Sequence, residues 1–259
     1  MIKFFRHIRR SLIQKNQMGK YFKYAIGEIL LVVIGILIAL QINNWNEDRK
    51  EIIEERSILQ NLYDEFSENK KVYAQNIVET KSAKQLGYRI MNLMGKPEAK
   101  IKTENIDSLL YFVLEPGEFR PSENTINDLI QSGRLRLLRN KKLKTLLYNW
   151  QSQLKDVEVA FERVELKVDN ELIPYLSKHY ALKDIDKYGA LNWKDNSELN
   201  VNKYAIFYDI EFENIIDDYL YRVVAAENSF KRIGIILPTT NKNSIKQKKQ
   251  TKYCIIFHS

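Results

Sequence analysis

The hydrophobic positions of the chain form two patterns, an uninterrupted apolar stretch near the N-terminus and long amphipathic repeats after it. The apolar stretch runs from Tyr24 to Ile42 and carries Glu28 as its one charged residue. As a helix it would be about 28 Å long, close to the hydrocarbon thickness of a bilayer. We therefore expect a transmembrane helix over residues 24–45. Three aromatic residues near its ends are the expected interfacial anchors: Tyr21, Tyr24 and Trp45.

Two alternatives compete with a membrane span. A buried core helix of a soluble protein would need only the charge-free run Ile29–Leu40. A cleaved signal peptide would need small residues at a cleavage site, and the sequence LQINN at residues 40–44 offers none of the A-x-A type. The flanking residues favour the uncleaved span.

Helical periodicity continues almost without interruption from Asn46 to Met94, where Gly95-Lys96-Pro97 ends it. The run SENKK at residues 67–71 is a polar gap in the apolar stripe, where we expect the helix either to be exposed or to be interrupted. Thr103 is the expected N-cap of a helix over 104–114.

The next segments contain helix-boundary signals and the most regular repeat in the chain. Ser122 is a plausible N-cap, with Glu123 in the first turn and Gly133 as the C′ residue. Asn140 is expected to cap a long helix that reaches about residue 180, and Pro174 should kink or end it. After a polar loop at 181–204, helical periodicity returns over 211–230.

No segment shows the two-residue alternation of a sheet, so the predicted fold is all-α. We expect a single N-terminal transmembrane helix followed by an extracytoplasmic antiparallel helical bundle or coiled coil with long helices. The predicted divisions are a basic cytoplasmic segment (1–23), the transmembrane helix (24–45), a periplasmic helical domain (46–232) and a basic, disordered tail (233–259).

The distribution of charge predicts the orientation. Seven basic residues and no acidic residue precede the span, whereas residues 46–65 contain three basic residues. The positive-inside rule then places the N-terminus in the cytoplasm and the bulk of the chain in the periplasm, with the span in the inner membrane. Residues 2–12 also have the pattern of a basic amphipathic helix that would lie on anionic lipid head groups, which we favour over nucleic-acid binding.

The net charge of +8 divides unevenly along the chain: +6 for residues 1–45, −5 for 46–229 and +7 for 230–259. Because the large middle part is mildly acidic, we expect no nucleic-acid partner. The single cysteine, Cys254, excludes an internal disulfide, so packing must stabilise the fold.

Two stretches carry a resemblance to a known family: YAIGEILLVVIGILIALQINNWNEDRK after the basic start MIKFFRHIRR, and RPSENTINDLIQSGRLRLLRNKKLKTLLYNW. Over roughly residues 1–180 the chain resembles a widespread uncharacterised family (a domain of unknown function) of single-pass inner-membrane proteins from Bacteroidota. The resemblance implies an N-in topology and an α-helical periplasmic domain, and it implies no reaction. It also implies an acidic, helix-forming C-terminus, whereas the chain after Phe230 is basic and acid-free. Either a disordered tail or an altered reading frame accounts for that departure.

The usual catalytic motifs are absent from the sequence. The motifs H-E-x-x-H, C-x-x-C, G-x-S-x-G and G-x-x-x-x-G-K-[ST] do not occur, and His179 is the one histidine in the middle part. We expect His179 to be a surface residue and Glu51–Glu55 to be a solvated helix face. We therefore predict no enzyme activity, no metal site and no cofactor.

Two sets of residues are candidate contact sites. Within the span, Gly27, Glu28, Gly35 and Ala39 are candidates for contact with a second transmembrane helix, because Gly35 and Ala39 form a small-x-x-x-small pair. Glu28 is close enough to the end of the span that interfacial tolerance is the alternative. The second set, between two helices, is a candidate surface for an anion or a partner, with a solvated turn as the alternative: Arg134, Arg136, Arg139, Lys141 and Lys142.

These features favour a membrane-anchored helical module for protein–protein interaction or scaffolding. Its expected partners are the lipid bilayer, a second copy bound through the transmembrane helix and an unidentified protein. The alternative is a ligand-sensing periplasmic bundle that acts through a partner, since the 23 residues before the span cannot hold a signalling domain.

Overall fold

The computed structural model describes residues 18–199 and 201–256, including their side chains except those of Tyr21 and of residues 237–256. Within this range all regular elements are helical, which confirms the all-α prediction. Three helices are long: α2 (Met18–Leu93), α6 (Lys141–Lys167) and α9 (Ile210–Ile256). The predicted amphipathic helix at residues 2–12 lies outside the described residues.

Shorter helices connect the three long ones. Between α2 and α6 lie α3 (Glu98–Ile101), α4 (Ile106–Leu114), α5 (Asn124–Gln131) and the 3₁₀ helix Arg134–Leu137. Between α6 and α9 lie a π-helical turn (Val168–Leu172), α7 (Ile173–His179), α8 (Leu182–Ile185) and the 3₁₀ helices Asp186–Tyr188 and Ala205–Tyr208.

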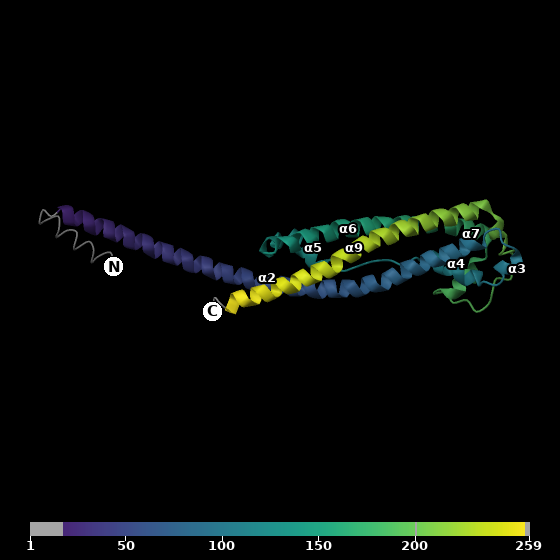
Figure 1. Cartoon of the computed structure of the whole chain (residues 1–259), viewed down its shortest axis with the longest axis horizontal. Helices are drawn as coiled ribbons and strands as arrows, with labels where there is room; N and C mark the ends of the chain where they lie inside the picture. The colour runs from purple at the N-terminus through teal and green to yellow at the C-terminus, as the bar shows by residue number, and fades with distance from the viewer. Residues whose placement is uncertain (1–17, 200, 257–259) are drawn as a thin grey trace.

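Helix α2 contains both the apolar stretch and the first amphipathic segment without a break, so the polar gap at 67–71 does not interrupt it. Its first part extends away from the rest of the molecule (Figure 1). The large apolar residues from Ile26 to Ile42 are 44–63% exposed, which does not fit the alternative of a buried core helix. Among the described residues, α2 is the one helix long and apolar enough to cross a membrane.

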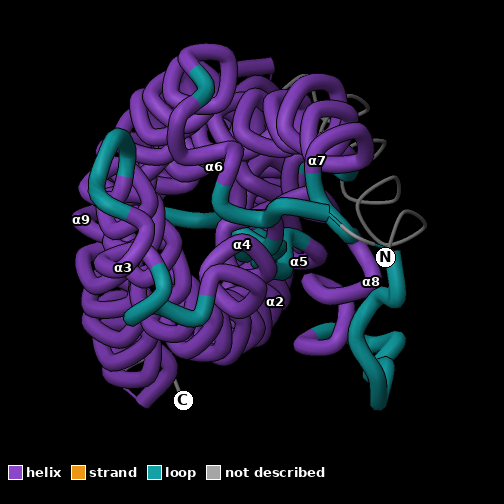
Figure 2. Tube along the Cα trace, turned by 90° about the vertical axis from the view of Figure 1, so that its right-hand side faces the viewer, coloured by secondary structure: helices purple, strands orange, loops and turns teal. Residues whose placement is uncertain are grey.

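The three long helices pack side by side beyond the apolar stretch (Figures 1 and 2). Helix α9 packs along both α2 and α6. It runs antiparallel to α2, because Leu220 lies beside Gly87 whereas Phe230 stacks on Tyr73 with ring centroids 4.5 Å apart. This arrangement buries one apolar face of each long helix.

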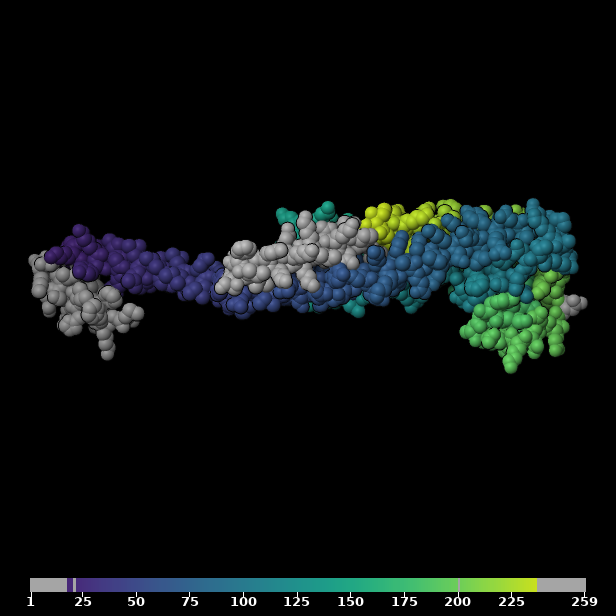
Figure 3. All heavy atoms as spheres, turned by 60° about the horizontal axis from the view of Figure 1, so that its bottom comes forward, coloured from purple at the N-terminus to yellow at the C-terminus, as the bar shows by residue number. Residues whose placement is uncertain are grey.

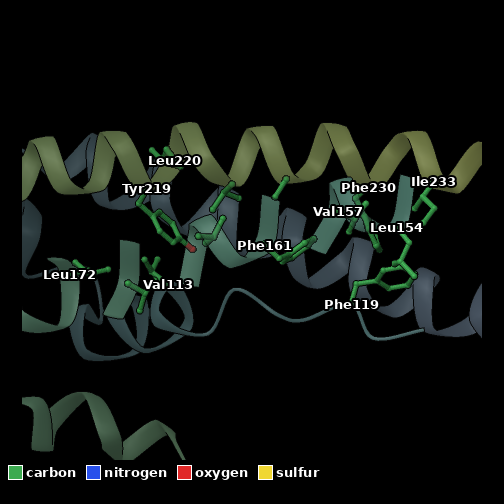
Figure 4. Close-up of a cluster of buried hydrophobic side chains, with 14 of the residues drawn as sticks. Val113, Phe119, Leu154, Val157, Phe161, Leu172, Tyr219, Leu220, Phe230 and Ile233 are labelled. Carbon is green, nitrogen blue, oxygen red and sulfur yellow. The ribbon is translucent and has the colours of Figure 1, made fainter. Parts of the chain in front are cut away.

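Aromatic and aliphatic side chains pack together in the core (Figure 4). Phe230 from α9 contacts Phe119 at 4.7 Å and Phe161 at 6.0 Å between ring centroids, both in edge-to-face geometry. Further along, Trp150 of α6 is fully buried against Phe66 of α2, at 5.0 Å. Residues far apart in the sequence therefore form one continuous core.

Two of the predicted helix boundaries agree with the structure. Asn140 caps α6, accepting a hydrogen bond from the Leu143 amide at 3.1 Å. Gly133 follows α5 with φ of 70°, a left-handed conformation that glycine adopts without steric cost.

The predicted N-cap of α4 was wrong. Asn105 caps α4, accepting from the Ser108 amide at 3.1 Å, whereas the Thr103 hydroxyl donates back to the Lys100 carbonyl. Thr103 is held in the turn that ends α3, so the next helix begins two residues later than expected.

Helix α6 ends in a π-helical turn just before Pro174, which lies in the first turn of α7. Proline has no amide hydrogen for the preceding turn, and the wider π turn accommodates the lost bond without ending the helical path. Regular helix then continues to His179, close to the expected end.

The C-terminal segment differs from the disordered tail expected from residue 233. Helix α9 continues to Ile256, through Gly234 and Pro238. Ile233 is fully buried because it follows Phe230 by three residues and extends the same apolar face. Gly234 brings α9 close to α2, since a Cβ at this position would clash with the Tyr73 hydroxyl.

Part of the segment between α7 and α9 protrudes sideways from the helices, near the end of the molecule farthest from the start of α2 (Figure 3). Part of it is tied back by Asp184, which accepts a hydrogen bond from the Ser197 amide at 2.7 Å. The predicted polar loop at 181–204 thus contains α8 and a 3₁₀ turn.

Candidate functional site

The basic connector between α5 and α6 lies against the acidic run at the start of the packed part of α2. Arg136 pairs with Glu51 at 3.0 Å, and Arg134 pairs with Glu54 at 3.4 Å. All four side chains are at least 40% exposed, so water screens both pairs. Two charge runs that the sequence analysis treated separately are brought together here.

Glu55 lies at the centre of this contact and is 1% exposed. Its carboxylate accepts a hydrogen bond from the Arg139 amide at 2.7 Å and lies 3.7 Å from the Arg139 side chain. The expectation of a fully solvated acidic face is therefore wrong for Glu55. Lys141 and Lys142 are exposed, and neither forms an ion pair with a described residue. The part of this surface left for an anion or partner is therefore these two lysines.

A second contact holds the loop before α5 on α2. The Asn69 side chain donates to the Ser122 carbonyl and accepts from the Ser122 amide, both at 2.8 Å. Asn69 is 1% exposed although it lies in the polar gap of the apolar stripe. The gap therefore marks a docking position for the loop, a role that the sequence analysis missed although the polar interruption signalled it.

Glu65 of α2 caps α5 in place of the expected Ser122. Its carboxylate accepts hydrogen bonds from the Ser122 hydroxyl at 2.7 Å and from the Thr125 amide at 3.1 Å. Ser122 donates to Glu65 and does not cap the helix itself. A negative charge at a helix N-terminus also complements the helix dipole.

The same region concentrates carboxylates. The second oxygen of Glu65 is buried without a hydrogen-bond partner among the described atoms. Burial, followed by the charges of Glu158 and Glu65, raises the pKa of Glu123 above its ordinary value. The loop is thus held by strong hydrogen bonds but carries an electrostatic cost at neutral pH.

A network of ion pairs joins the end of α6 to α9. Lys167 is 5% exposed and contacts both Glu171 and Asp218, the latter at 2.8 Å. Burial acts to lower the pKa of Lys167, but its hydrogen bonds to the two carboxylates outweigh burial and raise it. Burial alone would raise the pKa of Asp218, and the hydrogen bonds from Lys167 and Arg222 lower it instead. This network fixes the position of Arg222 beside α6.

The candidate contact residues of the span lie on a part of α2 that no other described segment covers. Gly35 and Ala39 are exposed, and no atom of another side chain or segment lies within 4 Å of where a Cβ would be at Gly27 or Gly35. Glu28 is half-buried on the same helix. Of the aromatic anchors, Tyr24 is 56% and Trp45 45% exposed, and the side chain of Tyr21 lies outside the described part.

The one central histidine, His179, lies at the end of α7. His179 is exposed, as expected, and stacks on Tyr175 at 4.4 Å between ring centroids. The Tyr175 hydroxyl donates to Asp209 at 2.6 Å, which lowers the pKa of that carboxyl. Among the residues that the structure describes, no three His, Cys, Asp or Glu side chains converge so as to hold a metal ion.

Comparison with protein families matches residues 28–93 to a family of unknown function (DUF6090). The match agrees with the predicted resemblance to an uncharacterised family and does not address membrane topology. It begins inside the apolar stretch and ends at the last residue of α2, so it lies within a single helix. Neither the curated proteins nor the solved structures gave a match.

Proposed function

We propose that this protein is a single-pass, membrane-anchored interaction module. In this proposal α2 crosses the inner membrane and holds the packed helices in the periplasm, where they bind a protein partner or act as a scaffold. The observation that carries the proposal is the unbroken course of α2 from the exposed apolar stretch into the packed helices. From residue 46 to Leu93 this helix is about 70 Å long, so it ties the core rigidly to the membrane.

The predicted orientation rests on the excess of basic residues before the span. Its test is a pair of reporters fused after residue 259 in the full-length chain. Alkaline phosphatase should be active and green fluorescent protein dark, because the C-terminal side would be periplasmic. The reverse pattern, or recovery of the protein in a salt-washed soluble extract, would refute the proposal.

We also propose that two copies associate through the small-residue face of the span. Ile53 follows Gly35 by about five helical turns, so the two residues point in the same direction. Ile53 is 55% exposed, whereas Leu62, about two and a half turns further on, is fully buried in the core. The Gly35 face therefore points away from the packed helices, which leave room for a second copy.

The test uses Ile53→Cys in a Cys254→Ser background, in membranes. A short thiol crosslinker should join two copies, and Gly35→Leu should abolish the product because a large side chain separates the helices. Val33→Leu, which enlarges a side chain on the opposite face of the span, is the matched control. A crosslink that survives Gly35→Leu unchanged would exclude this interface.

A second candidate function is ligand sensing by the periplasmic helices through a partner protein. The same unbroken helix favours it, because a displacement of α2 in the core would reach the membrane directly. A small molecule that copurifies with the full-length protein and shifts its melting temperature would support sensing over scaffolding.

A further inference from the structure

A groove of about 460 Å³ lies between α6 and α9 on the surface of the packed helices. Four basic residues line it, together with Asp156 as the acidic residue: Lys155 and Arg163 from α6, and Arg222 and Arg232 from α9. Small and apolar residues also line it, including Ala160 and Ala225. These basic residues form no pattern in the sequence, because they lie on two helices far apart in the chain.

The packing of the two helices places the basic residues in two pairs. The Arg222 side chain donates to the Arg163 carbonyl at 3.4 Å, so these two arginines are neighbours across the groove. Helices α6 and α9 run antiparallel. Going forward along α6 from the Phe161 contact to the Lys167 contact, the partner residue on α9 moves backward, from Phe230 to Asp218.

The second pair follows from this register. Lys155 precedes Arg163 by about 12 Å of helix, and Arg232 follows Arg222 by about 15 Å. Lys155 and Arg232 therefore face each other at the second end of the groove. The groove thus carries positive charge at both ends and is also lined by small residues, such as Ala160 and Ala225.

The charge at each end is only partly neutralised within the chain. Arg222 is paired with Asp218 at 3.0 Å, whereas Arg232 donates to the Ser229 hydroxyl at 2.9 Å, which is uncharged; Asp156 is the acidic residue of the lining. Lys155 and Arg163 are exposed, and neither forms an ion pair with another described residue. Like charges that face each other across a surface favour an anionic occupant.

We propose that this groove binds an acidic helical segment of a partner protein. Two carboxylates seven or eight residues apart on a helix are about 11–12 Å apart, which matches the separation of the two basic pairs. Small or apolar residues between them would pack on Ala160 and Ala225. A nucleic acid carries charge at every residue and fits neither the uncharged lining residues between the basic pairs nor the net charge of −5 of residues 46–229.

This inference rests on the proposed interaction role and names the chemistry of the partner. The probe is a fluorescently labelled helical peptide with two glutamates eight residues apart and alanine and leucine between them. Its matched control carries glutamine at both positions. Binding is measured by anisotropy with the full-length protein in detergent, at two salt concentrations.

The glutamate peptide should bind more tightly than the glutamine peptide, and more weakly at high salt. The double variant Lys155→Gln/Arg163→Gln should weaken binding about tenfold, because two ion pairs are lost. The control variant Lys81→Gln/Lys194→Gln removes the same charge from two exposed lysines outside the groove and should change the affinity less than about twofold. A carbodiimide should couple the glutamate peptide preferentially to Lys155.

Equal weakening by both double variants, equal binding of both peptides, or absence of binding to the wild-type protein would overturn the proposal. A carbodiimide crosslink from Lys155 to a second copy of the chain, formed without peptide, would overturn it in favour of self-association. The reporter pattern and the Ile53→Cys crosslink are measured on the same variants. If the groove does not bind the peptide, the reporter pattern and the crosslink are unaffected. That outcome is therefore distinguishable from a refutation of the proposed membrane-anchored module.

Discussion

Replacing Asn69 by alanine is expected to release the loop before α5 from α2. The change removes two hydrogen bonds of 2.8 Å and leaves the amide and the carbonyl of Ser122 without these partners. Each bond contributes about 0.5–1.5 kcal/mol, and an unpaired buried group adds a further cost. Because Ser122 is half-buried, water can replace part of the lost hydrogen bonding, so we expect the free energy of unfolding to fall by about 2–4 kcal/mol.

For a chain of this size such a loss corresponds to a fall in melting temperature of about 5–12 °C. Circular dichroism of the full-length protein in detergent measures this fall, and hydrogen exchange shows whether the Ser122 amide loses its protection. Gln75→Ala is the control, because Gln75 is an exposed polar residue two turns further along α2. If Asn69→Ala shifts the melting temperature no more than Gln75→Ala and the Ser122 amide stays protected, the assigned docking role of Asn69 is incorrect.

The remaining predictions concern packing, a buried carboxylate and pH. Gly87→Ala should destabilise the fold by about 1–3 kcal/mol, because the new Cβ would lie 2.7 Å from Leu220; a Leu220→Ala background should reduce that cost in a double-mutant cycle. Glu55→Ala should lower the free energy of unfolding by about 1–3 kcal/mol in chemical denaturation, since it removes the part-buried hydrogen bond from the Arg139 amide. The pKa of Glu123 is raised above its ordinary value of 4.5 in the folded protein, so the folded state binds its proton more tightly than the unfolded state does. This contribution to stability is fully present below pH 4.5 and is lost as the pH rises through the folded-state pKa. Glu123→Gln should therefore raise the melting temperature at pH 7 by the equivalent of less than about 1 kcal/mol and lose that advantage near pH 4; a benefit that persists at pH 4 would point to a different cause.

Local patterns in the sequence determined most of the helices. The apolar stretch predicted an exposed helix of membrane-spanning length, and the three- and four-residue spacing of apolar side chains predicted α2, α6 and the first part of α9. Asn140 and Gly133 marked true helix boundaries, because a cap and a left-handed turn depend on residues close in the chain. Because such interactions join residues close together in the chain, they can be predicted from the sequence alone.

The tertiary structure decided which of these local signals are overridden. Glu65 caps α5 from another helix, so the expected capping role of Ser122 could not hold, and Asn69 is buried because a loop more than fifty residues away docks on it. Likewise, the basic residues of the α6–α9 groove face each other only because two helices pack antiparallel. Hydrogen bonds and charges between distant segments depend on the register of packed helices, and a single sequence contains no local signal for that register.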